Sequence, residues 1–318
     1  MLQKIDDFIW GVPLIVMILS VGIFLTIRLK GLQITKLPQA VKNIFKNDKT
    51  GKAGEVSSFG ALCMALSATI GTGNIVGVAT ALVTGGPGAL FWMWISAFFG
   101  MAVAYMEAVL AQIFKEKKDD EFVGGLPFYG RKLLGNSVFV GVFLSVLYIL
   151  YALCCLPAQG FNVVSSIGTM AEIVTGTTIA SDSMFYYIVG GIIIAITAVI
   201  AFGGIKKVSK WTDKMVPVMA VLYIATVLVL ILLNLDQIPY FFSAVFGGAF
   251  KPEAFFGGAF ATVLAQGVKR GLMSNEAGQG TITMSAASAD AKHPCEQGIL
   301  ASIGVFLDTI VICTLSGF

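Results

Sequence analysis

Apolar residues gather in long runs along the chain, and most of these runs are close to the length that crosses a lipid bilayer. The hydrocarbon core of a bilayer is about 30 Å thick, and a helix of about 20 residues spans it. The pattern predicts eight membrane-spanning helices and an all-α fold. The runs lie at residues 8–27, 55–83, 88–114, 136–170, 184–202, 215–234, 254–290 and 298–318.

Basic residues are distributed unevenly between the two sets of loops that these helices define. If the N-terminus lies outside, all 21 Lys and Arg residues except Lys4 and Lys251 fall in the cytoplasmic loops. Cytoplasmic loops of membrane proteins carry an excess of Lys and Arg. The charge pattern therefore predicts a multi-pass protein of a prokaryotic plasma or inner membrane, embedded in the lipid bilayer, with its N-terminus outside.

Composition supports a membrane protein and narrows the possible functions. Only 12% of the residues are charged and 57% are apolar, whereas about a quarter of the residues in a soluble domain are charged. The formal net charge is +3, so we expect no nucleic-acid partner. The five cysteines mostly lie in apolar runs and lack metal-ligand spacing, which indicates a packing role.

The run at 55–83 is too long and too rich in glycine for one straight helix. As a helix its 29 residues would measure about 43 Å, and its middle is Ala68-Thr69-Ile70-Gly71-Thr72-Gly73-Asn74-Ile75. Unwound backbone at membrane depth is tolerated only where it lines a protein-enclosed cavity. The helix ends at such a break favour an anion on one side and a cation on the other. This suits an amino acid bound with a sodium ion, although Gly73 and Gly77 could instead serve close helix packing.

The run at 254–290 predicts a second broken helix, with its break at about Gln266 to Gly271. This run enters from outside and follows the first broken helix by five helices, so the two would belong to inverted repeats. Interrupted helices at matching places in two halves indicate a binding site near the centre of the bilayer. Gln266 and Gly267 are therefore predicted to bind substrate.

Ionisable residues at membrane depth are costly and often functional. Asp308 lies in an apolar run beside Thr309, and both are candidate sodium ligands because a hard cation needs several oxygen ligands. The alternative for Asp308 is a structural carboxylate. Glu107 lies near the cytoplasmic end of its run, where it could pair with Lys115. Glu276 could form a cytoplasmic gate, or only hold a loop.

Polar side chains also interrupt the apolar run at 136–170. Gln159 and Phe161 are candidate residues of a substrate pocket, because a polar group beside an aromatic ring can orient a small ligand. The alternative is ordinary hydrogen bonding between helices.

Three segments resemble signatures of the alanine/glycine:cation symporter family, also called the sodium:alanine symporter family. They are ATIGTGNIVGVATALVTGGPGALFWMW at 68–94, GVKRGLMSNEAGQG at 267–280 and FLDTIVICT at 306–314. The resemblance implies a leucine-transporter-type fold, in which inverted five-helix repeats follow one extra N-terminal helix. It also implies sodium-driven uptake of small neutral amino acids such as alanine or glycine, and no enzymatic activity.

The resemblance assigns roles around the first break. Gly71, Thr72, Gly73 and Asn74 would form the unwound segment, Asn74 would be a sodium ligand, and the backbone of Thr69 would be another. The expected substrate-binding residues there are Thr69, Ile70, Gly71, Thr72 and Gly73. The segment LPAQGFNVVS at 157–166 departs from the pattern expected for the family.

The resemblance also divides the chain into three parts. Residues 1–54 would form the extra helix and a cytoplasmic elbow, 55–234 the first repeat, and 254–318 the first two helices of the second repeat. The last three core helices would then be absent, and a transport-inactive fragment is one alternative. A non-coupled channel or receptor-like subunit is another, but it predicts a continuous polar pore that the sequence lacks. The sequence does not define the oligomeric state.

Overall fold

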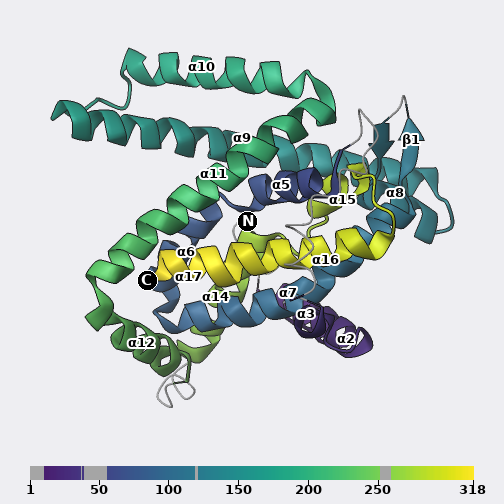
Figure 1. The fold of residues 1–318 in the computed structure, drawn as a ribbon, viewed down its shortest axis with the longest axis horizontal. Helices are drawn as coiled ribbons and strands as arrows, with labels where there is room; N and C mark the ends of the chain where they lie inside the picture. The colour runs from purple at the N-terminus through teal and green to yellow at the C-terminus, as the bar shows by residue number, and fades with distance from the viewer. Residues whose placement is uncertain (1–10, 37, 39–55, 119–120, 251–258) are drawn as a thin grey trace.

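The apolar runs form helices in the computed structural model, which describes residues 11–36, 38, 56–118, 121–250 and 259–318 (Figure 1). A short antiparallel hairpin, β1 paired with β2, is the exception to the helical prediction among these residues. The elements in chain order are α2 (Val12–Arg28), α3 (Leu32–Thr35), α5 (Ser58–Thr69), η1 (Gly73–Gly77), α6 (Val78–Gly85), α7 (Gly88–Ile113), β1 (Glu116–Lys118), β2 (Glu121–Val123), α8 (Leu126–Leu133), α9 (Val138–Thr175), α10 (Met184–Ala201), α11 (Gly204–Leu233), η2 (Leu235–Gln237), α12 (Ile238–Phe250), α14 (Ala259–Asn275), α15 (Ile282–Ser288), α16 (Pro294–Val305), η3 (Phe306–Cys313) and α17 (Thr314–Gly317).

Among the described residues, five helical stretches are long and apolar enough to cross a membrane: α7, α9, α10, α11 and the continuous stretch Pro294–Gly317. A sixth candidate is the bent pair formed by α5 and the stretch Gly73–Gly85. The helices α2 and α14, in the first and seventh apolar runs, are 17 residues long each. The structure thus confirms a polytopic helical protein, while the count of eight spans stays a prediction. Most of the expected cytoplasmic elbow at 28–54 lies outside the described residues.

Helix α7 forms the centre of the packing and contacts α2, α12, α14, α15 and α16. Small residues allow this close approach: Ala97, Ala104 and Ala108 on α7 are fully buried, and they follow the three- to four-residue spacing of one helix face. On α16, a Cβ at Gly298 would lie 2.7 Å from the ring of Tyr105. Close packing of small residues is typical of helix interfaces in membranes.

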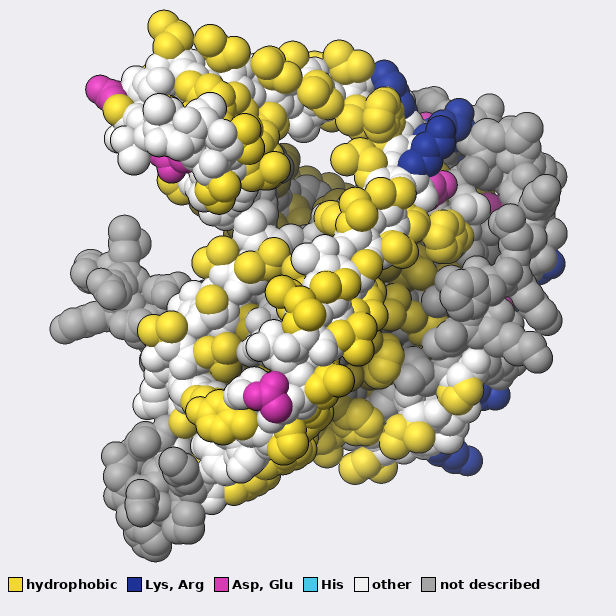
Figure 2. Space-filling view, turned by 60° about the vertical axis from the view of Figure 1, so that its left-hand side comes forward, with side chains coloured by type: hydrophobic (Ala, Val, Ile, Leu, Met, Phe, Trp, Pro, Cys, Tyr) yellow, Lys and Arg dark blue, Asp and Glu magenta, His cyan; other side chains and the backbone are white. Residues whose placement is uncertain are grey.

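The hairpin of α9 and α10 extends away from this centre at the top of Figure 1. None of the described residues of α10 is buried, and Figure 2 shows apolar side chains over much of the visible surface. Exposed apolar area on this scale is unusual for a water-soluble monomer. It is the surface expected for helices that face lipid or further helices.

The first predicted break is present. Helix α5 ends at Thr69, Ile70 takes an extended conformation with ψ 96°, and the chain resumes as the π-helix η1. The two halves differ in direction by 51°. The glycines on both sides of Thr72 therefore interrupt the helix where the sequence predicted.

The second predicted break is wrong in its position. Helix α14 runs without interruption through Gln266 to Gly271. The unwound segment instead comprises residues 276–281, between α14 and α15, where Glu276, Gly278 and Gly280 have positive φ. Gly267 serves packing, because a Cβ there would lie 2.4 Å from the backbone oxygen of Ala89 on α7.

Candidate functional site

Three irregular segments meet inside the molecule: the π-helix η1, the end of α14 and the π-helix η3. They bring together five polar side chains that are each at most 1% exposed, which we call the polar cluster: Asn74, Ser274, Asn275, Asp308 and Thr309. Sequence reasoning had not predicted η3, and single turns of π-helix are frequent at functional sites. Buried polar groups are costly unless they are paired, so the cluster has to be explained by its contacts.

The side-chain nitrogen of Asn74 lies where several acceptors converge. An amide NH₂ has only two hydrogens to donate, so it cannot satisfy all of these acceptors at once. The distances from Nδ2 are 2.7 Å to Asp308 Oδ1, 3.2 Å to the backbone oxygen of Asp308, 3.0 Å to Ser274 Oγ and 3.4 Å to Cys313 Sγ. A convergence of acceptors of this kind is suited to a cation.

The carboxylate of Asp308 is fully buried. Its Oδ2 accepts hydrogen bonds from Ser274 Oγ at 2.7 Å and Thr309 Oγ1 at 2.9 Å, and its Oδ1 accepts from Asn74. These donors are neutral, and a buried negative charge held by neutral groups alone remains costly. A positive ion at this position would offset that cost.

The side chain of Asn275 forms hydrogen bonds both within the polar cluster and with the unwound segment at residues 276–281. Its Nδ2 donates to Thr309 Oγ1 at 3.1 Å, and its Oδ1 accepts from the backbone N–H of Ala277 at 3.0 Å. The unwinding of the chain after α14 is therefore coupled to the position of Thr309 on η3. A change of conformation in the unwound segment would reach the polar cluster directly.

The unwound segment of the first break lies beside the cluster. The backbone N–H of Gly71 donates to Asn74 Oδ1 at 2.8 Å. Thr72 Oγ1 donates to Gln159 Oε1 at 3.1 Å, so the structure brings Gln159 of α9 to this break. The hydroxyl of Thr69 is buried and has no hydrogen-bond partner among the described residues.

Phe161 and Gln266 were also predicted to bind substrate, and this assignment stays a prediction. Phe161 is 71% exposed on α9. Gln266 packs its Cβ near Gly85, at the far end of α6, and it precedes Ser274 by eight residues, or about 12 Å of helix. The reason for assigning Gln266 and Gly267 to substrate binding was a break at that point, and the helix is continuous there.

Glu107 contacts a segment that the sequence did not suggest. Its Oε2 accepts a hydrogen bond from the backbone N–H of Gly278 at 3.0 Å, in the second unwound segment. Lys115, its expected partner, donates to the backbone oxygen of Ala289 at 2.6 Å. Glu107 therefore caps a backbone group that unwinding has left free.

Ser274 and Asn275 were missed as candidate site residues. Both lie within GVKRGLMSNEAGQG, directly before the unwound segment. Their signal was the end of the helix, because polar side chains at a break can contact a ligand there. Placing the break ten residues too early hid that signal.

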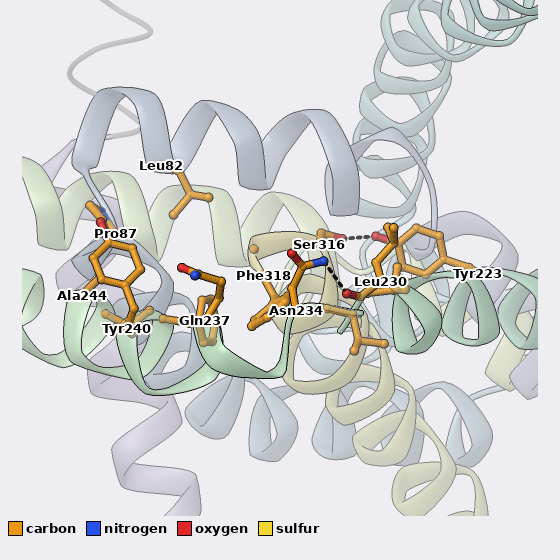
Figure 3. Close-up of a pocket in the computed structure, with 15 residues that line it drawn as sticks. Leu82, Pro87, Tyr223, Leu230, Asn234, Gln237, Tyr240, Ala244, Ser316 and Phe318 are labelled. Atoms are coloured by element: carbon orange, nitrogen blue, oxygen red, sulfur yellow. Dashed lines mark hydrogen bonds between the residues drawn. The ribbon is translucent and has the colours of Figure 1, made fainter. Parts of the chain in front are cut away.

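A cavity of about 600 Å³ lies apart from the polar cluster, between α6, α11, α12 and α17 (Figure 3). Its lining includes Tyr223 and Ser316, whose hydroxyl oxygens are 2.5 Å apart, together with Asn234 and Gln237. None of its lining residues is charged and none belongs to the polar cluster. The cavity is therefore separate from the polar cluster.

The whole chain, residues 1–318, matches the model of the sodium:alanine symporter family. The protein belongs to this family. Its relatives include the sodium/alanine symporter AgcS of Methanococcus maripaludis, which is 42% identical over 100% of this chain and 69% of its own length. An uncharacterized transporter of Haemophilus influenzae is 41% identical over 99% of this chain and 68% of its own length.

A third relative is named for an amino acid other than alanine. The probable sodium/glutamine symporter GlnT of Bacillus subtilis is 38% identical over 98% of this chain, which spans 63% of the relative's length. Membership of the family confirms that the protein is a multi-pass membrane transporter and not an enzyme. The names of its relatives differ in the amino acid, so the family alone leaves the substrate open.

Proposed function

We propose that this family member is a sodium-coupled symporter of small neutral amino acids, alanine and glycine, that works by alternating access. The observation that carries the proposal is the convergence of four acceptors around Asn74 Nδ2, beside the buried carboxylate of Asp308, whose hydrogen-bond donors among the described residues are neutral. Sodium is a hard cation and favours several oxygen ligands. Here it is cargo that moves with the amino acid.

The polar cluster supplies the oxygen atoms for the ion. Asp308 contributes the charge, and the hydroxyls of Ser274 and Thr309 already contact its carboxylate. Rotation of the Asn74 amide would turn its oxygen toward the same point. The carbonyl of Thr69, at the end of α5, is the proposed backbone ligand.

The amino acid is proposed to bind along Ile70 to Gly73, next to the ion. Helix α5 has ended here, so backbone groups are free to contact a carboxylate or an ammonium group. Gln159 is already within hydrogen-bond distance of Thr72. A Cβ at Gly71 would have Gln159 Oε1 as its nearest neighbour, at 3.9 Å, which leaves room for a small side chain.

The two interrupted helices also support the architecture that we propose. The pairs α5/α6 and α14/α15 lie in the second and seventh apolar runs, five positions apart, and each contains an unwound segment beside the polar cluster. We propose that they are equivalent helices of inverted repeats in a leucine-transporter-type fold. The proposed location is the cell membrane, with the N-terminus outside.

The first test is equilibrium binding of alanine and glycine to the purified protein in sodium chloride and then in potassium chloride. Replacing Asn74 with alanine should weaken sodium-dependent binding about 10- to 100-fold, the range for losing a hydrogen bond to a charged group. Asn234→Ala, at the end of α11, is the matched control and should bind as the native protein does. An unchanged sodium dependence in Asn74→Ala would remove Asn74 from the site.

Replacing Gly71 with leucine should abolish alanine binding and leave the protein folded. The new side chain would extend toward Gln159 without meeting other atoms close to its Cβ, so it should fill the proposed pocket at little cost to folding. Alanine binding and thermal unfolding of the same sample are the two measurements. Native affinity in this variant would place the amino acid elsewhere.

A further inference from the structure

The unwound segment of residues 276–281 is held from two sides by side chains of other helices. Tyr148 on α9 donates a hydrogen bond from its hydroxyl to the backbone oxygen of Gln279, at 2.6 Å. Glu107 on α7 accepts from the N–H of Gly278 at 3.0 Å. Backbone groups left free by unwinding are thus paired by two separate helices.

The absence of a side chain at Gly280 leaves space for the hydroxyl of Tyr148. The glycine has φ +78°, a conformation that other residues rarely adopt. A Cβ at this position would lie 2.2 Å from the hydroxyl oxygen of Tyr148. The hydroxyl therefore occupies the space that a side chain at residue 280 would need.

The two helices that hold the segment have different neighbours. Helix α7 packs along α14, α15 and α16, the helices on both sides of the segment. Helix α9 packs mainly on α8 and α10. Within the described parts of the chain, two hydrogen bonds join α9 to the interrupted helices, from Thr72 to Gln159 and from Tyr148 to Gln279. The first is beside the proposed substrate, and the second is 11 residues away, or about 16 Å along α9.

We infer that Tyr148 is a positioning residue for transport, which clamps the second unwound segment to α9 and thereby holds Ser274 and Asn275 in the ion-binding arrangement. Asn275 transmits the restraint, because its side chain contacts both Ala277 and Thr309. Breaking the Tyr148 hydrogen bond frees α15 to move relative to α9. The effect on sodium rests on the proposed function, whereas the restraint on the segment does not.

Amide hydrogen exchange of the purified protein, with and without sodium, tests the clamp through the variant Tyr148→Phe. A typical hydrogen bond contributes enough for about a five-fold change in an equilibrium. In sodium-free buffer we expect exchange of residues 276–281 to become about five-fold faster while α16 is unchanged. Sodium should bind about five-fold more weakly, because coupling between two equilibria is reciprocal.

A second variant, Gly280→Ala, should loosen the same segment by displacing the hydroxyl. Its effect should be smaller when Tyr148 is already phenylalanine, because the displaced group is then absent. Tyr187→Phe, at a 70% exposed position on α10, is the control and should change nothing.

Unchanged exchange of the segment in Tyr148→Phe would overturn the inference, and so would faster exchange spread evenly over α7 and α16. Sodium should slow exchange of residues 276–281 in the native protein if the proposed sodium site is right, and unchanged exchange would show that it is wrong. The comparison of the native protein with Tyr148→Phe in sodium-free buffer would still test whether Tyr148 restrains the segment.

Discussion

Replacing Asp308 with asparagine is expected to weaken sodium binding by on the order of 100-fold or more. The carboxylate is fully buried and its described hydrogen-bond donors are neutral. Since a charged partner contributes up to about 3 kcal/mol to a buried hydrogen-bonded contact, its loss removes most of the attraction for the ion. Sodium binding can be followed by calorimetry, or by the sodium-dependent rise of the melting temperature.

The same variant should be at least as stable as the native protein when sodium is absent. An isolated buried charge is costly, and asparagine removes the charge while keeping the shape of the side chain. Asp236→Asn, on the exposed helix η2, is the control for a lost carboxylate and should leave sodium binding unchanged. Native sodium affinity in Asp308→Asn would show that Asp308 has only a structural role.

Replacing Gly267 with alanine is expected to destabilise the protein by about 3 kcal/mol, because the new Cβ would overlap α7. It would lie 2.4 Å from the backbone oxygen of Ala89 and 2.5 Å from the Cβ of Trp92. Neither atom can move without shifting α7, and overpacking of this kind typically costs about 1–3 kcal/mol or more. Thermal unfolding and the yield of folded protein are the measurements.

Gly77→Ala is the matched control, because a Cβ there meets no atom within 4 Å. In a helical position this substitution should be neutral or slightly stabilising. If Gly267→Ala is as stable as the native protein but fails to bind alanine, Gly267 contributes to substrate binding, as the sequence predicted, and not to packing against α7.

The two interrupted helices show how far local pattern predicts structure. Around Gly71 and Gly73 the apolar run has one glycine cluster, and the helix breaks there. The run at 254–290 has two such clusters, and either could end a helix. The structure uses Gly267 and Gly271 for contact with α7 and unwinds the chain at Gly278 and Gly280. The choice depends on a neighbouring helix that local sequence does not specify.

The polar cluster shows the same limit. Asp308 is conspicuous because a carboxylate in an apolar run is costly, and Asn74 is conspicuous because it follows a glycine break. Ser274 lies in a polar stretch, and its only signal is the end of a helix whose position the sequence did not fix. Asn74 and Ser274 are 200 positions apart, and Ser274 and Asp308 are 34 apart. Only packing shows that they meet.

The sequence by itself determined that the protein is helical, that it crosses a membrane several times and that it belongs to the sodium:alanine symporter family. These conclusions depend on the length of apolar runs and on short motifs, which are local properties of the chain. The tertiary structure decided which glycines unwind the second helix, which side chains converge on Asp308 and which helices hold the unwound segment. Those features arise from contacts between segments that are distant in the sequence. Close packing allows the observed arrangement of these segments and excludes alternatives in which atoms would overlap.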